Sequence, residues 1–307
     1  MSIFERGGLA AMNRETYKHW ACQKMIEASR SNIWDGHWAC AVLALIRLLE
    51  DRLVPGELES GIRRNLEKIV EDHPNAETYR IDREHGEFRS SMLARLIRNG
   101  RTNNSLGHDV IYSYYILDLL GGPGGIAGSA ELYRAMSTLA DGFAAFGPGY
   151  VTINGEHKVV HPDGIGRTAE RFRLTSSSLL DLFHDFHRPS RMEKGDMQLG
   201  HLLTHGHAIV ELKLANPGFD LDILDEAFFS RLDILNEANR IERETSAPSQ
   251  DSPSKEAEWN PLEPSYWEHA LTDNRHGHFY KYAYSYLKLN RLAERRLADF
   301  RSFSRIL

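Results

Sequence analysis

The sequence predicts an all-α protein in which paired helices form an α/α toroid, with one small inserted β-hairpin. Apolar residues recur at helical spacing over most of the 307 residues. The dipeptide Gly-His occurs five times, and four of these pairs open an apolar, helix-like run. Spaced recurrence of one short signal is typical of an internal repeat. Helix pairs repeated around an axis give a toroid with an inner ring around a cavity, although other helical arrays fit the same spacing.

The Gly-His pairs point to the inner helices. They are Gly36-His37, Gly107-His108, Gly200-His201, Gly206-His207 and Gly277-His278. We expect the runs that begin at His37, His108, His207 and His278 to form the inner ring. Because a helix N-terminus presents free N–H groups and a positive dipole end, helices pointing the same way would bring their histidines to one mouth.

Periodicity and turn signals give the remaining elements. Helices are predicted over 14–30, 36–52, 56–72, 87–99, 106–120, 129–146, 165–187, 194–215, 221–243, 263–271 and 276–301. The charged helices 56–72 and 221–243 belong on the outside. Strands at 150–153 and 157–160 flank Asn154-Gly155, a dipeptide favoured in tight hairpin turns. The Gly/Pro run at 121–125 follows no strand and precedes no Lys-Ser/Thr, so it predicts a loop and not a phosphate-binding motif.

Residues 1–307 are predicted to form a single helical domain. The polar, Pro/Ser-rich segment 244–260 is expected to be a mobile excursion, because the last Gly-His helix lies beyond it. An inter-domain linker is the alternative interpretation. A chain of this length can bury a substantial core.

Composition bounds the partners and the compartment. The net charge is −6 and no long Lys/Arg block occurs, so nucleic acid is not an expected partner. No run approaches 18 apolar residues and no signal peptide is recognisable, which predicts a cytoplasmic protein with no membrane partner. Cys22 and Cys40 lie in apolar helical patterns, as expected in a reducing compartment. A protein partner or a homo-oligomer is left open.

The expected chemistry is acid–base catalysis on a small molecule. The candidate catalytic residues are His37, His108, His207 and His278, with the carboxylates Asp35, Asp109 and Glu211. Imidazole beside a helix N-terminus is biased toward its neutral form, which is the form that accepts a proton. Helix capping is the alternative role of Asp35 and Asp109.

Aromatic side chains share the helical faces of these histidines. The candidate substrate-binding residues are Trp34, Trp38, Tyr112, Tyr115, Tyr282 and Tyr286. Flat apolar faces with polar tips suit a mid-sized, partly apolar metabolite, whereas a sugar phosphate or a nucleotide would require clustered Arg and Lys. The alternative interpretation of such stripes is core packing.

No cofactor is expected, because the chain has neither a dinucleotide fingerprint nor a P-loop. A divalent metal is the alternative. His201 and His205 lie one helical turn apart, and His207 follows, which is a spacing that zinc or non-haem iron can use. The segment lacks the His-Glu-x-x-His arrangement, in which the glutamate also activates water.

Three helix starts carry a family resemblance. Residues 37–45, 107–112 and 205–212 begin with or contain His and continue with small and aliphatic residues. These segments resemble helices of the questin-oxidase-like family of natural-product tailoring enzymes, which are helical and modify aromatic compounds. The resemblance implies an enzyme of secondary metabolism that performs a tailoring or cyclisation reaction. The competing expectation is a non-catalytic helical module that binds a small ligand or supports a partner enzyme.

Overall fold

Helices make up most of the structure, a computed structural model that describes residues 14–76, 87–121, 128–153, 156–159, 161, 164–185, 198–245, 259–295 and 300–306. The helices are α1 Arg14–Arg30, α2 Gly36–Glu50, α3 Glu59–Asp72, α4 Phe88–Asn99, α5 His108–Gly121, α6 Ala130–Ala145, α7 Ser176–Asp185, α8 Gln198–Ala215, α9 Ile223–Thr245, α10 Pro264–Thr272, α11 His278–Leu292 and α12 Arg301–Ile306. Short 3₁₀ turns occur at η1 Ile33–Asp35, η2 Gly56–Leu58 and η3 Ser105–Gly107, and the strands are β1 Tyr150–Ile153 and β2 Glu156–Val159.

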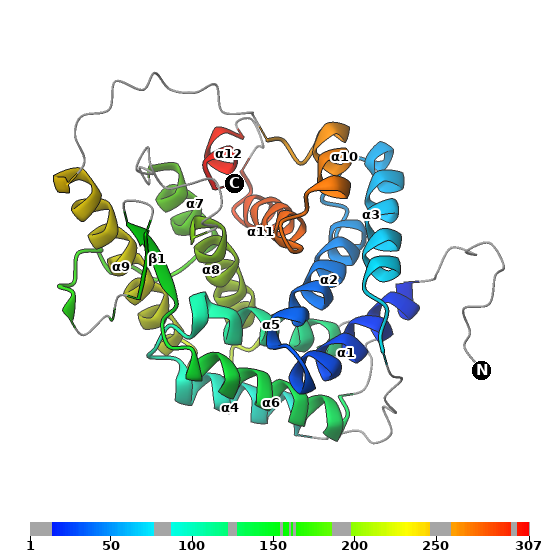
Figure 1. Ribbon diagram of the computed structural model, residues 1–307, viewed down its shortest axis with the longest axis horizontal. Coiled ribbons are helices and arrows are strands. Elements are labelled where there is room, and N and C mark those ends of the chain that lie inside the picture. Colours follow the sequence, from blue (N-terminus) through cyan, green and yellow to red (C-terminus); the bar gives the residue numbers. More distant parts are fainter. Residues whose placement is uncertain are drawn as a thin grey trace.

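Four helices occupy the middle of the molecule (Figure 1). α2 contacts α5, α5 contacts α8, α8 contacts α11, and α11 contacts α2. Nearly all of their residues are buried, as expected for helices that are apolar around most of their circumference. The helices that begin near Gly-His pairs therefore form the core of the fold.

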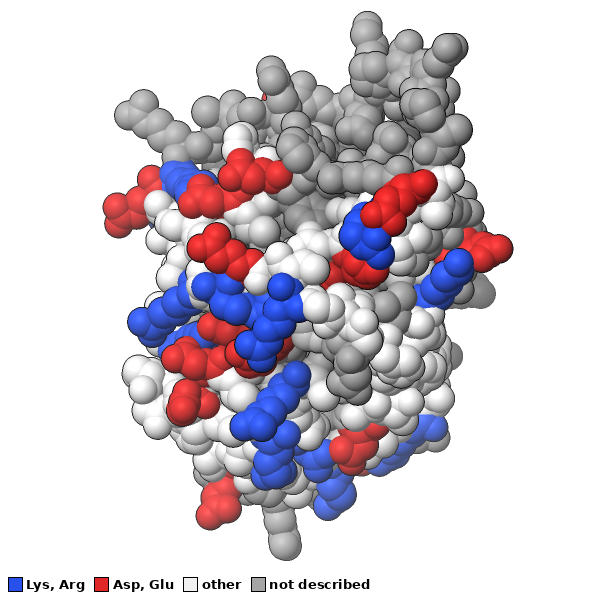
Figure 2. Space-filling view, turned by 90° about the vertical axis from the view of Figure 1, so that its left-hand side faces the viewer, with Lys and Arg blue, Asp and Glu red and all other residues white. Residues whose placement is uncertain are grey.

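The other helices pack around these four. α1 contacts α2 and α6, α3 contacts α2 and α10, and α9 contacts α8 and β1. α3 buries Ile62, Leu66 and Ile69 and turns its charged residues outward, as its amphipathic pattern predicts. On the face in Figure 2, acidic and basic side chains are interspersed. None of the described helices is long and apolar enough to cross a membrane.

The predicted hairpin is confirmed. β1 and β2 pair antiparallel, with Tyr150 opposite Val159 and Ile153 opposite Glu156. The second strand begins one residue earlier than predicted. Asn154-Gly155 itself falls outside the described residues.

One predicted helix is too long at its start. The helix expected at 165–187 begins only at Ser176. Asp233 of α9 accepts hydrogen bonds from the backbone N–H groups of Thr168 and Ala169 and pairs with Arg171, so tertiary contacts hold this stretch in a non-helical conformation. Reciprocal bonds between Thr175 and Ser178 then cap α7.

The C-terminal prediction also needs a correction. The helix expected at 276–301 is two helices, because α11 ends at Leu292 and α12 starts at Arg301. Helix α5 ends at Gly121, as the glycine run predicts. The rest of that run and most of the Pro/Ser-rich segment, residues 246–258, lie outside the described part of the chain.

Two Gly-His glycines allow close helix packing. A Cβ at Gly36 would overlap the ring of Tyr112, and a Cβ at Gly200 would overlap the ring of Tyr282. Both tyrosines are buried, at 1% and 0% exposure, so neither ring has free space to move into.

Gly200→Ala is therefore expected to lower the free energy of unfolding by about 2 kcal/mol through overpacking. Gly61 in α3 is the control, because its Cβ would meet only Trp267 Cβ at 3.6 Å. Gly61→Ala should raise stability by about 0.5 kcal/mol through helix propensity. Urea unfolding of both variants measures the difference; equal effects would contradict the packing argument.

Candidate metal centre

Four buried imidazoles meet where the central helices begin. His37 of α2, His108 of α5, His201 of α8 and His278 of α11 each offer one ring nitrogen, and these nitrogens all lie within 4.8 Å of one another. Nε2 of His37 is 3.1 Å from Nε2 of His108, and Nε2 of His278 is 3.0 Å from Nε2 of His201. The rings are between 2% and 5% exposed. We call these four residues the histidine cluster.

The turns before α5 and α11 share the pattern Asn-x-x-Gly-His-x-x-x-Tyr-x-Tyr, which begins at Asn104 and at Asn274. In each turn three successive residues have positive φ: 46°, 64° and 88° at 105–107, and 46°, 57° and 76° at 275–277. Two of the three are not glycine, and left-handed backbone costs such residues about 1–2 kcal/mol each. The same costly turn therefore precedes a cluster histidine twice.

These turns orient the imidazoles. In each turn the carbonyl of the first left-handed residue accepts a hydrogen bond from Nδ1 of the histidine three positions later. Ser105 accepts from His108 in this way, and Arg275 accepts from His278 at 2.5 Å. Nδ1 therefore carries the proton and Nε2 directs a lone pair into the cluster. Metal-ligating histidines are held by backbone carbonyls in the same way.

Lys281 lies against the cluster from within the core. Its Nζ is 2.6 Å from Nδ1 of His37, and the side chain is 2% exposed. Burial lowers the pKa of Lys281 to about 7. A neutral amine can accept the Nδ1 proton of His37, which leaves a lone pair on Nε2 of that ring as well.

Three of the cluster histidines, His37, His108 and His278, are neutral near pH 7. Burial holds the pKa values of His37 and His278 well below the usual 6.5, and Lys281 lowers them further when it is protonated. The same two causes lower the pKa of His108 to about 3. Uncharged imidazole is the form that binds transition metals.

The structure corrects one of the four histidines that were expected to converge. His201, and not His207, joins His37, His108 and His278. Gly206-His207 lies in the interior of α8, so it does not open a helix. Six residues along a helix correspond to a rotation of about 240° and a rise of about 9 Å, which carries His207 to another face and another level.

The three histidines expected as alternative metal ligands do not come together either. Of His201, His205 and His207, only His201 lies in the cluster. The ring of His205 packs against Gly107 and Phe228, and neither of its nitrogens has a hydrogen-bond partner among the described residues. Burial lowers the pKa of His205 to about 3.

His207 belongs to a second polar group deeper in the core. Its Nδ1 is 3.0 Å from Oγ of Ser285, and its Nε2 is 3.9 Å from Oε1 of Glu211. Burial lowers the pKa of His207 to about 3 and raises that of Glu211. Glu211 lies 3.5 Å from Nζ of Lys288. The candidate catalytic residues His207 and Glu211 thus lie near each other, but away from the cluster.

The two tyrosines one turn after His108 and His278 cover the cluster rings. Tyr112 contacts His37 and His108 edge-on, and Tyr282 contacts His201 edge-on and His278 at a tilt. Tyr115 lies farther inside, against Tyr114 and Tyr284.

The other expected aromatic residues differ in position. Trp34 stacks on His37, meets His108 edge-on, and is only partly buried. Trp38 lies between His73 and His276, with ring centroids 3.8 Å and 4.7 Å away. Tyr286 packs on Phe300 and Phe303, so it contributes to the core.

The two aspartates beside Gly-His pairs play different parts. Asp109 is buried, accepts hydrogen bonds from Asn104 Nδ2 at 2.8 Å and from the Val110 N–H, and has its pKa raised to about 6 by burial. It therefore stabilises the left-handed turn. Asp35 is half-buried at the end of η1, where it accepts a bond from Asn32.

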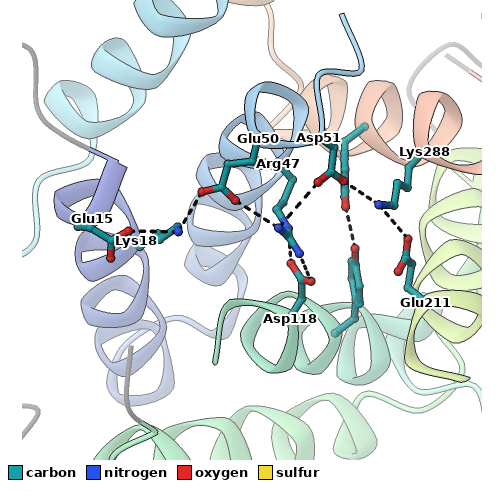
Figure 3. Close-up of polar contacts among 10 residues, drawn as sticks. Glu15, Lys18, Arg47, Glu50, Asp51, Asp118, Glu211 and Lys288 are labelled. Atoms are coloured by element: carbon teal, nitrogen blue, oxygen red, sulfur yellow. Dashed lines mark hydrogen bonds and ion pairs between the residues drawn. The ribbon is translucent and has the colours of Figure 1, made fainter. Parts of the chain in front are cut away.

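The opposite ends of the central helices carry charges. The tenth residues after the cluster histidines are Arg47, Asp118, Glu211 and Lys288. Figure 3 shows the ion pairs Arg47–Asp118 and Lys288–Glu211 in one network that also includes Asp51. Pockets of about 310 Å³ and 430 Å³ lie on this network and share Arg47 and Asp118 as lining residues. Ten residues of helix, about 15 Å, separate this end from the cluster.

Two of the residues that form the centre were not among the expected catalytic ones. His201 was considered only with His205 and His207, and Lys281 was missed. The sequence does mark Lys281, because this charged residue lies one turn after His278, between Tyr280 and Tyr282, in a helix that is mostly buried. No protein-family model, curated protein or solved structure matches the chain.

Proposed function

We propose that the histidine cluster binds one divalent transition-metal ion and that the protein is a metal-dependent enzyme acting on a small, partly apolar metabolite. The observation that carries the proposal is the convergence of four imidazole nitrogens from four helix starts. Ligand nitrogens about 2.1 Å from an ion lie about 3 to 4 Å from each other, and the distances of 3.0 and 3.1 Å fall at the short end of this range. Imidazole ligands suit Zn²⁺, Cu²⁺, Fe²⁺ and Ni²⁺.

The pKa values favour metal binding over simple acid–base catalysis by these histidines. A general base works best when its pKa is near the operating pH. His108, with a pKa of about 3, is too weak a base to remove a substrate proton efficiently at pH 7. Low proton affinity is no obstacle to a ligand, because fewer protons compete with the metal.

The charge balance indicates what the site would bind next. Four neutral imidazoles leave the double positive charge of a bound ion uncompensated, and Lys281 adds no negative charge. The ion would supply a Lewis acid that polarises an oxygen of the substrate or of water. An oxygen anion of the substrate, such as a phenolate or an enolate, would therefore be stabilised there.

The side chains around the cluster support a partly apolar substrate. Trp34 contacts His37 and His108 and reaches the surface. Phe146, which is 59% exposed, lies 5.3 Å from Trp34 between ring centroids. These flat surfaces suit an unsaturated or aromatic molecule. The same class of substrate follows from the questin-oxidase-like resemblance, and a tailoring or cyclisation reaction in secondary metabolism remains our proposal.

Metal analysis of the purified, dialysed protein tests the first step. We expect about one tightly bound ion per chain. Addition of azide to the protein loaded with Co²⁺ then tests the second step, because an anion that reaches an open position on the ion changes the visible absorption spectrum. A wild-type protein that binds no divalent ion would refute the proposal.

A structural ion is the second candidate function, because four protein ligands are typical of closed structural sites. The burial of all four rings favours it. In this case metal removal would unfold the protein, and azide would leave the Co²⁺ spectrum unchanged. A catalytic ion predicts a folded metal-free protein and an azide-dependent spectrum.

We further propose that the fold is an α/α toroid in a single domain. The cyclic contacts of α2, α5, α8 and α11 support an inner ring, and α1, α3 and α9 pack on its outside. The repetition of the same turn before α5 and α11 supports an internal duplication of this unit.

A further inference from the structure

We propose that His276 is a loading ligand, which binds a divalent ion at the surface and passes it to the histidine cluster. The proposal rests on metal binding by the cluster, as proposed above. The cluster itself is buried, so an ion needs a route to it. On the inner side that route is filled by core residues such as Lys281, Cys40 and Tyr115. Of the described aromatic residues whose rings contact the cluster, His276 is exposed and Trp34 is partly exposed, whereas Tyr112, Phe143 and Tyr282 are buried.

The position of His276 suits this role. The side chain is exposed, and its ring centroid is 5.2 Å from that of His37. Its Nε2 lies 3.3 Å from the carbonyl oxygen of Trp34 and can donate to it only as N–H. Nδ1 of the neutral ring therefore carries the lone pair that a metal requires.

The paired turn shows that the histidine is not needed for the backbone. His276 has a φ of 57°, and the equivalent residue before α5, Leu106, has a φ of 64°. Leu106 precedes Gly107-His108 as His276 precedes Gly277-His278. The turn thus forms equally with an apolar side chain. An exposed imidazole occurs only in the copy whose turn faces His37 and Trp34.

Stopped-flow loading of metal-free protein with Co²⁺ tests the proposal, with visible absorption as the readout. The variant is His276→Leu, because leucine occupies the equivalent position of the paired turn. We expect the variant to bind one Co²⁺ per chain with unchanged equilibrium affinity. Both loading and release to a chelator should be slower, and by the same factor, because the equilibrium affinity does not change.

His161→Leu is the matched control, because it also removes an exposed imidazole. It should load at the wild-type rate. His276→Asn, which tolerates positive φ and removes the imidazole, is the second variant and should be as slow as His276→Leu. Wild-type loading rates in both His276 variants would overturn the proposal. Weaker equilibrium binding with faster release would also overturn it, because His276 would then be a permanent ligand. A wild-type protein that takes up no Co²⁺ would instead refute the metal site itself.

Discussion

Replacement of His201 by alanine is expected to abolish stoichiometric metal binding, whereas replacement of His207 by alanine on the same helix is expected to leave it intact. Both histidines follow a glycine, both are buried, and both lie in α8. Only His201 is within reach of the other three cluster nitrogens. Removal of one of four ligands costs at least about a hundredfold in affinity, judging from the 10- to 100-fold effect of groups that merely support ligands.

The measurement is metal content after dialysis, together with a Co²⁺ titration. His201→Ala should retain well under one ion per chain, while His207→Ala should retain about one. Circular dichroism at pH 7 must show both variants folded, because each truncation leaves a cavity in the core. Loss of the ion from His207→Ala with retention in His201→Ala would invert our assignment of the site.

The sequence contains enough information for the helices but not for the fourth ligand. Local periodicity and Asn-Gly define α1 and the hairpin almost to the residue, because both depend on neighbours in the chain. The start of α7 depends on Asp233, which is far away in sequence. A pattern of local propensity cannot report such a contact.

Gly200-His201 and Gly206-His207 look alike as dipeptides. They differ in the direction in which each histidine points from α8, and this direction depends on how α8 packs against α11. Gly200 is opposite Tyr282 just as Gly36 is opposite Tyr112, and this packing fixes His201 toward the cluster. The pattern Asn-x-x-Gly-His-x-x-x-Tyr-x-Tyr, which covers the starts of α5 and α11, is visible in the sequence alone. That it orients the imidazoles is evident only from the contacts of the Ser105 and Arg275 carbonyls with the histidine rings.

Acid is expected to unfold the metal-free protein steeply below pH 6.5. Histidines that are neutral in the folded state, with pKa values of about 3 for His108, His205 and His207, accept protons near pH 6.5 once unfolded. Below that pH the unfolded state binds more protons, so their contribution to stability is complete above pH 6.5 and is lost as the pH falls. His37 and His278 shift in the same direction.

Buried carboxyl groups oppose this loss. Burial raises the pKa of Asp109 to about 6 and also raises the pKa values of Glu211 and Asp225, so the folded state takes up protons there first. The histidines with lowered pKa values outnumber these carboxyls, and each proton of difference between the unfolded and the folded state contributes about 1.4 kcal/mol per pH unit. With a net difference of about three protons, or about 4 kcal/mol per pH unit, a domain stabilised by about 5–15 kcal/mol would unfold between about pH 5 and pH 3.

Urea unfolding of metal-free protein between pH 5.0 and 7.5 measures this slope. His205→Leu should reduce it by one proton, about 1.4 kcal/mol per pH unit. At pH 7 the same change should not destabilise the protein much, because it removes two buried nitrogens without described partners. Gly61→Ala changes stability without removing a titrating group and should keep the wild-type slope. A slope equal to wild type in His205→Leu would mean that His205 is already protonated in the folded protein, contrary to its burial.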